Sequence, residues 1–176
     1  MDETGAVGEP SRRIPDPGFA GDTGAVPSGL AAALAAYAAD PQGSRAGVLA
    51  ALQASRLLVP VVAVLGEVEH GADGLAHDKS SDMAAVLLRG NDGRLALLAF
   101  TGTESLSAWN PEARPVPVPA QVAAQSALQD GAAALVVDVA GPTPLVVEGP
   151  DLQGLAAGWR LAVVGERAAW IRPDPE

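Results

Sequence analysis

The sequence predicts a single domain of the α/β class, of the α+β type, with helices packed on a mixed, largely antiparallel sheet of about five strands. Three observations support this fold class. The chain has 176 residues, which suits one domain with a terminal tail. Hydrophobic residues make up 48 % of it and aromatic residues only 3 %, so a substantial core can form and must be aliphatic. Two pairs of apolar runs are separated by turn-forming residues, and capped helical segments lie between the pairs.

The first 28 residues differ in composition from the rest of the chain. They contain four prolines, several glycines and acidic residues, but few apolar side chains. Such a segment buries too little apolar surface to offset the entropy lost on ordering. Residues 1–28 are therefore predicted to be a disordered acidic Pro/Gly-rich tail, and the α/β domain is expected to span residues 29–176.

Two helices are predicted ahead of the first strand. The first spans residues 30–40 with Ser28 as its N-cap, and a proline follows it. The second begins after Ser44 and is closed by Arg56, whose positive charge suits the carbonyl end of a helix.

An unbroken apolar run at residues 57–65 predicts the first strand. Its Val and Leu content implies burial on both faces, whereas Pro60 places its first residues at a sheet edge or a bend. Residues 66–82 then form a long polar loop that contains both histidines of the chain and several carboxylates.

Residues 83–88 and 95–100 predict a hairpin. The turn between them contains Asn and Gly, which tolerate positive φ. Thr101 and Glu104 then match the S/T-x-x-E capping box, in which the two side chains bond free amides of the first helical turn. A short helix is therefore predicted here, with Trp109 on its inner face.

The second half of the chain predicts further strands and helices. Residues 115–119 form an extended segment, at most a short edge strand, because three of the five are proline. Residues 120–130 predict a helix that ends at Gly131 and turns three apolar side chains inward, namely Val122, Ala123 and Leu128. A second hairpin is predicted from residues 133–139 and 145–148.

Three elements are predicted near the C-terminus. Asp151 can cap a short helix that ends near Trp159. Residues 161–164 and 168–171 then predict two strands.

The charge of the chain argues against two classes of partner. The formal net charge is −10 and the pI is about 4.5, with only 11 Lys and Arg residues. A nucleic-acid surface needs clustered cations that neutralise phosphates, and anionic membranes attract basic segments. We therefore expect no nucleic-acid partner and no membrane partner.

Missing residue types and motifs narrow the chemistry further. The chain has no cysteine, which excludes disulfides, thiolate catalysis and sulfur-ligated metals. Its acidic N-terminus lacks the basic and apolar regions of a signal peptide, and its apolar runs are too short to span a bilayer. A cytoplasmic localisation is therefore predicted, without a cofactor.

Three segments of the chain occur in the order found in a known family. They are RLLVPVV from Arg56, KSSDM from Lys79, and FTGTESL from Phe100, the last followed by a tryptophan. As a set they resemble the N-terminal domain of the SseB family, in its actinobacterial form, over roughly residues 30–155, the span of one domain. Gly102 departs from the usual Phe-Thr-Ser of the family. The resemblance implies an α/β domain but no established chemistry, so it assigns no catalytic residue.

Two constellations suggest chemistry but have simpler explanations. Imidazole and carboxylate groups in the polar loop could bind zinc: His70, Asp73, His77 and Asp78. Their spacing matches no zinc motif, so we favour a solvated loop and expect no metal site. Ser105, His77 and Asp82 could form a nucleophile, base and orienting group. Ser105 lacks the G-x-S-x-G context of such a nucleophile, however, and is expected on a helix surface.

The best candidate for a ligand or partner surface surrounds the predicted capping box. The amides of residues 101–103 follow a strand at a helix start, where anions can bind, although no Walker A or G-x-G-x-x-G sequence supports a nucleotide. The candidate residues are Asp82, Thr101, Thr103, Glu104 and Trp109. Trp109 and Trp159 could instead seal helices against the sheet.

These observations predict a non-catalytic interaction or regulatory module of the cytoplasm, not an enzyme, with an unknown protein partner. The alternative is a small-molecule-binding protein or minor enzyme that uses a pocket around Phe100 to Trp109 and the acidic loop at residues 66–82. A concave pocket at the candidate residues would favour the alternative. A flat or convex apolar patch would favour the interaction module.

Overall fold

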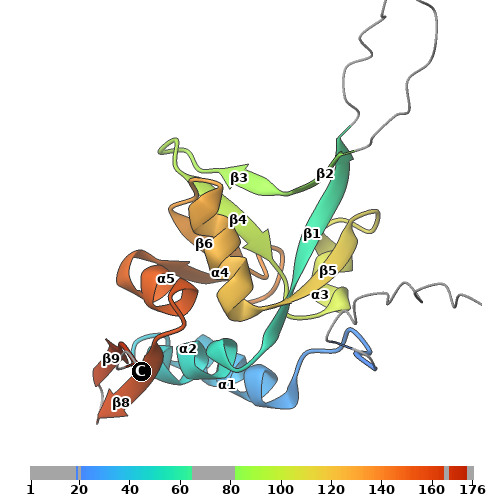
Figure 1. Ribbon diagram of the computed structural model, residues 1–176. Coiled ribbons are helices and arrows are strands. Elements are labelled where there is room, and N and C mark those ends of the chain that lie inside the picture. The colour runs from blue at the N-terminus through green and yellow to red at the C-terminus, as the bar shows by residue number, and fades with distance from the viewer. Residues whose placement is uncertain (1–18, 20, 65–81, 165–166, 174–176) are drawn as a thin grey trace, which may run out of the picture.

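The computed structural model describes residues 19, 21–64, 82–164 and 167–173 (Figure 1). The helices in this part of the chain are α1 (Ser28–Ala39), α2 (Arg45–Gln53), α3 (Thr103–Trp109), α4 (Ala120–Gln129) and α5 (Gly149–Ala156). The strands are β1 (Arg56–Val64), β2 (Asp82–Ala85), β3 (Leu87–Arg89), β4 (Leu95–Ala99), β5 (Arg114–Pro119), β6 (Ala134–Val137), β7 (Leu145–Glu148), β8 (Arg160–Val164) and β9 (Arg167–Ile171). The predicted α+β class is therefore confirmed. Within the described ranges, no helix is both long and apolar enough to cross a membrane.

The strands form two sheets and a separate hairpin of β8 and β9. One sheet has the order β2-β1-β5, and the other has the order β3-β4-β6-β7. β4 and β6 run parallel, whereas the other described pairs are antiparallel, so the predicted mixed, largely antiparallel pairing is confirmed. Leu58 in β1 and Phe100, just after β4, exchange two backbone hydrogen bonds of 2.8 Å and thereby join the two sheets.

Prolines protect the outer edge of the three-stranded sheet. Pro115, Pro117 and Pro119 of β5 lie opposite alternate residues of β1, and Pro117 lies opposite Leu58. Because Leu58 turns its N–H and C=O toward Phe100, the prolines occupy positions whose missing N–H would point away from β1. β5 thus pairs with β1 and offers few donors to any further strand. The predicted short edge strand is confirmed.

Pro60 does not lie at a sheet edge, which is one of the two placements, edge or bend, predicted for the start of this strand. It is in the middle of β1, the central strand of its sheet. The ladder between β1 and β2 ends at the neighbouring pair Val61–Ala85, and Val86 then donates its N–H to the Pro60 carbonyl at 3.3 Å. The missing N–H of Pro60 therefore falls where that ladder stops, which explains why the strand tolerates it.

The main core lies on one face of the four-stranded sheet, where α4 crosses in front of β4 and β6 (Figure 1). The sheet contributes fully buried side chains from alternate positions, such as Leu97 and Leu135. α4 contributes only alanines to its buried side: Ala120, Ala123, Ala124 and Ala127. Val122 and Leu128 are exposed, so the prediction that they point inward is wrong. The helix instead packs through its small side chains, which allow a close approach to the sheet.

The two predicted N-terminal helices are present and bury Leu30, Val48 and Leu52 in the main core. The sequence pattern predicts that Arg56 closes the second helix, and this prediction is wrong. α2 ends at Gln53, and Arg56 is the first residue of β1 with only 8 % of its surface exposed.

The predicted C-terminal strand pair is confirmed as β8 and β9. Trp170 packs on Gly154 of α5 so closely that a Cβ at Gly154 would collide with the indole ring. Its Nε1 donates to Asp151 Oδ1 at 3.0 Å, and Arg45 Nη2 donates to Asp151 Oδ2 at 2.7 Å. Asp151 therefore links three elements rather than capping α5, whose N-cap is Glu148.

Residues 21–27 lie against the domain, although the predicted tail includes them. Gly24 is buried, Val26 packs on the main core, and Asp22 forms an ion pair with Arg56. Ser28, also placed in the predicted tail, is the first residue of α1, and residues 1–18 and 20 lie outside the described residues.

Candidate functional site

Two polar residues follow the carboxyl ends of the parallel strands β4 and β6. Thr101 comes shortly after β4, and Asp138 comes directly after β6. The amide of Asp138 donates to the Ala99 carbonyl at 3.0 Å, which holds the two strand ends together. In α/β proteins, ligand-binding groups commonly gather at the carboxyl ends of parallel strands. Thr101 and Asp138 thus occupy a position at which a binding site would be expected.

Asp138 is the centre of this cluster and only 8 % of its surface is exposed. Its Oδ1 accepts hydrogen bonds from the Thr101 amide at 2.9 Å and from Ser105 Oγ at 2.6 Å. Its Oδ2 accepts one from Thr101 Oγ1 at 2.6 Å. The φ angle of +53° is left-handed, a conformation that Asp adopts more readily than most residues. The carboxylate therefore ties the end of β6 to the start of α3.

This geometry shows that the predicted capping box is wrong. α3 begins at Thr103 with Gly102 as its N-cap, and no side chain caps its amides. Thr101 is 1 % exposed, and its hydroxyl donates to Asp138 instead. The S/T-x-x-E pattern is local and gives no information on a carboxylate 37 residues away.

Sequence reasoning missed Asp138. The available signal was a carboxylate directly after an apolar strand, at the first position of a hairpin turn. Ser105 is half-buried and bonded to Asp138, so its assignment to a plain helix surface is also wrong. In the catalytic alternative for Ser105, His77 lies outside the described residues, and Asp82 is in β2, paired with Val64.

A second polar cluster surrounds Arg56, whose side chain is 7 % exposed. Its Nε and Nη2 donate to the two carboxylate oxygens of Asp22 at 2.6 and 3.0 Å. Nη2 also donates to the Ala25 carbonyl at 2.7 Å, and Nη1 donates to the Thr101 carbonyl. The Arg56 guanidinium, and then the Gly24 amide, hold the pKa of the Asp22 carboxyl below its usual value. The guanidinium is thus enclosed by oxygen acceptors.

We call residues 22–26 the N-terminal strap, because they lie across Arg56 and the start of α3. The Gly24 carbonyl accepts the Thr103 amide at 2.8 Å and Thr103 Oγ1 at 3.3 Å. Gly24 has φ of +76°, and a Cβ there would lie 2.5 Å from Thr103 Cγ2, so only glycine fits. A Cβ on Gly102 would lie 3.0 Å from Val26 Cγ2. The strap therefore fits closely over Gly102 and Thr103.

The structure brings together only some of the residues of the candidate surface predicted from the sequence. Thr101 and Thr103 lie together beside the strap, and Glu104 is exposed in the first turn of α3. Trp109 is half-buried and stacks on Phe100 with ring centroids 5.4 Å apart, so it belongs to a small apolar cluster rather than to the polar one. The loop residues considered as metal ligands, for which no metal site is expected, lie outside the described residues: His70, Asp73, His77 and Asp78.

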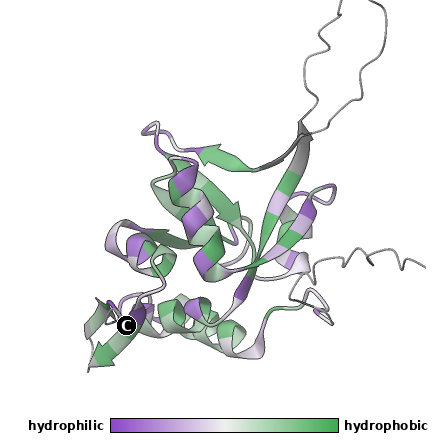
Figure 2. Ribbon diagram, viewed as in Figure 1, coloured by the Kyte–Doolittle hydropathy of each residue, from purple (hydrophilic) through white to green (hydrophobic). Residues whose placement is uncertain are grey.

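The second face of the four-stranded sheet is only partly covered. At one end, Leu98 and Phe100 are buried in the small apolar cluster with Leu106 of α3. On the two edge strands of this sheet, Leu88 in β3 and Val146 in β7 are 44 % and 40 % exposed. The strand register places both side chains on this face, because it aligns Leu88, Ala96 and Ala134 in one row and Val136 with Val146 in the next. Figure 2 shows the apolar character of β3 and β4 in this region.

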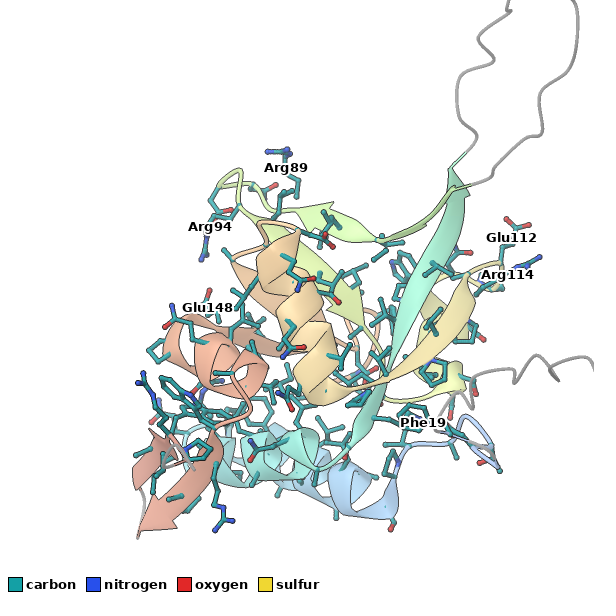
Figure 3. All side chains as sticks on the ribbon, viewed as in Figure 1. Phe19, Arg89, Arg94, Glu112, Arg114 and Glu148 are labelled. Carbon is teal, nitrogen blue, oxygen red and sulfur yellow. The ribbon has the colours of Figure 1, made fainter. Side chains whose placement is uncertain are left out.

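A groove with a volume of about 380 Å³ crosses this exposed part of the sheet. Apolar side chains form its floor, and the polar residues of its rim include Asp92, Arg94 and Glu148. Arg94 donates to Asp92 at 2.6 Å and to Glu148 at 3.0 Å, and Figure 3 shows Arg94 and Glu148 on the same side of the molecule. The Arg94 guanidinium lowers the pKa of Asp92, and the two carboxylates raise the pKa of Arg94. The groove therefore does not lie beside Trp109, where the small-molecule alternative predicts a pocket.

The match to a family model covers much of the structure just described. The model of the SseB protein N-terminal domain matches residues 30–154, from α1 into α5. The comparisons with curated proteins and with solved structures gave no match. Arg56, Thr101 and Asp138 lie within the matched residues, whereas the strap and the β8–β9 hairpin lie outside them. Because the match spans well over half of its length, the chain belongs to the SseB family, through the N-terminal domain of that family.

Proposed function

We propose that the protein is a non-catalytic interaction module of the cytoplasm, whose partner-binding surface is the open face of the four-stranded sheet. We call the groove-lining apolar side chains of this face the open face; Leu88 and Val146 are exposed, Ala96 and Val136 are half-buried, and Ala134 is buried between them. The observation that carries the proposal is the exposure of Leu88 and Val146, which lie on the two edge strands, β3 and β7, and both line one groove. Exposed apolar side chains that line a groove with a polar rim commonly mark a site of interaction.

The chemistry of the open face suits a protein partner. Its floor is apolar, and its rim carries one guanidinium, Arg94, between the carboxylates of Asp92 and Glu148. Protein interfaces typically combine an apolar centre with a polar rim of this kind. A nucleic-acid surface would need several unpaired cations, which this rim does not supply, and the net charge of −10 opposes such a partner.

The polar clusters give little support to catalysis. Asp138 accepts three hydrogen bonds from the chain itself, and Arg56 is enclosed by acceptors of the strap and of Thr101. A general acid or base must be able to reach a proton of the substrate. In the described structure, these groups are instead used to connect elements of the fold.

A small-molecule ligand is the second candidate, because a groove of about 380 Å³ falls within the size range of ligand sites. It would bind on the same open face rather than around Trp109. Mass spectrometry of both proteins and metabolites that co-purify with the full chain distinguishes the two candidates.

The test compares two double variants with matched exposure. Leu88→Ser with Val146→Thr alters the open face, where the side chains are 44 % and 40 % exposed. Leu128→Ser with Val122→Thr alters α4, where they are 43 % and 39 % exposed. A partner recovered with the parent chain should bind the open-face variant at least about tenfold more weakly, as expected for loss of apolar anchors. It should bind the α4 variant as it binds the parent. Equal binding to both variants would reject the open face.

A further inference from the structure

The N-terminal strap contacts the domain in the way a bound peptide contacts a receptor. Its Asp22 carboxylate makes two hydrogen bonds to Arg56, the bidentate geometry by which arginine recognises carboxylates. Its Ala25 carbonyl accepts a hydrogen bond from Arg56, and its Gly24 carbonyl accepts one from the Thr103 amide. The strap thus presents one carboxylate and two carbonyls to donors from residues that are distant in the sequence.

The surface beneath the strap is complementary to the strap in shape and in hydrogen-bonding groups. We define the socket as Arg56, Thr101, Gly102 and Thr103. The Thr101 carbonyl orients the guanidinium from the domain side, and Gly102 leaves room for Val26 of the strap. Without the strap, the guanidinium would keep only the Thr101 carbonyl among its present acceptors, and the Thr103 amide would lose its partner. An empty socket would therefore carry unpaired donors, which strongly favour a carboxylate.

The strap is held less firmly than the core. Thr23 and Ala25 are exposed, the Asp22 side chain is 19 % exposed, and Val26 is the single apolar anchor of the strap. Its other contacts are hydrogen bonds and one ion pair. Segments with few buried apolar contacts open locally without unfolding the domain.

We propose that the socket is a recognition site for an acidic peptide segment of a partner protein, and that the strap is its built-in competitor. The partner segment carries a carboxylate two residues ahead of a glycine, as Asp22 and Gly24 do in the strap. The socket is separate from the open face and does not depend on it. Because a tethered segment acts at an effective concentration on the order of millimolar, only a segment that binds more tightly or makes added contacts displaces it.

The experiment uses a fluorescently labelled peptide, FAGDTGAVP, which has the sequence of residues 19–27. Fluorescence anisotropy measures its binding to the full-length parent and to the full-length variant Asp22→Ala, whose own strap lacks the carboxylate. The control Asp130→Ala removes the same charge from an exposed residue at the end of α4. The peptide should bind Asp22→Ala at least about tenfold more tightly than it binds the parent or the control, since the competitor is weakened.

A second peptide, with Asn in place of its Asp, tests the role of the carboxylate without any change to the protein. It should bind Asp22→Ala at least about tenfold more weakly than the first peptide, because Arg56 loses its charged partner. Equal binding of the two peptides would overturn the proposal. Equal binding of the first peptide to the parent and to Asp22→Ala, or no binding to either, would also overturn it.

Discussion

The two faces of the four-stranded sheet carry similar aliphatic side chains in very different surroundings. On the covered face, Leu97, Leu135 and Leu145 are fully buried beneath the helices. On the open face, Leu88 and Val146 of the same sheet remain 44 % and 40 % exposed. Val146 is directly adjacent to Leu145 in the sequence. The pairing register, rather than the type of side chain, therefore decides which face of the sheet forms the core.

This comparison separates stability from interaction. Burial of an aliphatic side chain contributes to folding in proportion to the area removed from water, and Leu97, Leu135 and Leu145 on the covered face have already lost nearly all contact with water. The open face retains area that can still be buried against a partner. Substitutions on the two faces should consequently have opposite consequences for stability and for binding.

The largest expected effect is on the covered face. Leu135→Ala should lower the free energy of unfolding by about 2–5 kcal/mol, because it leaves a cavity in a fully buried site. Denaturant unfolding measures the change. A loss below about 0.5 kcal/mol, the range of surface substitutions, would mean that the two faces do not differ as described.

The next effect concerns the buried carboxylate at the end of β6. Asp138→Ala removes the acceptor of three hydrogen bonds and should cost about 1.5–3 kcal/mol, the range for bonds to charged groups. Asp138→Asn keeps the shape and the tolerance of a left-handed φ, so its cost should be smaller. Equal stability of the parent and both variants would refute the connecting role of Asp138.

The pH dependence of stability tests the strap. The folded pKa of Asp22 lies below its ordinary value, so its ion pair stabilises the fold above the unfolded pKa of about 3.9. This contribution disappears as the pH falls through the folded pKa. Asp22→Asn should therefore cost about 1.5 kcal/mol at pH 7, and the difference from the parent should narrow below about pH 4. A difference that stays constant between pH 7 and pH 3 would contradict the ion pair.

The smallest expected effect is on the open face. Leu88→Ser with Val146→Thr should change the free energy of unfolding by no more than about 1 kcal/mol, since both side chains are already partly in water. Denaturant unfolding beside Leu135→Ala provides the comparison. A cost similar to that of Leu135→Ala would show that the open face is part of the core.

The sequence predicts the elements of this fold well because their signals are local. The β3–β4 hairpin follows from the Asn and Gly of its turn, and the edge position of β5 follows from its prolines. Interactions between distant segments could not be predicted in the same way. The local sequence predicts that Arg56 ends a helix, because it does not show the contacts of Arg56 with Asp22 and the Thr101 carbonyl, which are distant in the sequence.

The candidate site shows the same limit. The sequence draws attention to Thr101 and Thr103, and both lie in the socket or beside Asp138. The reason given by the sequence, a capping box with Glu104, is wrong because a buried carboxylate bonds Thr101 more effectively. The open face could not be predicted from alternation alone, because β3, β4, β6 and β7 are apolar on both faces.

The absence of cysteine permits the most direct test of the open face. Single variants Leu88→Cys and Leu128→Cys place a thiol at sites that are 44 % and 43 % exposed, on the open face and on α4. The rate of labelling by a thiol reagent is measured with and without the partner recovered from the parent chain. Binding should slow the labelling of Leu88→Cys at least about tenfold and leave Leu128→Cys unchanged, because a bound partner excludes solvent from the centre of its interface. Unchanged labelling of Leu88→Cys in the presence of saturating partner would contradict the proposal that the open face is the binding surface.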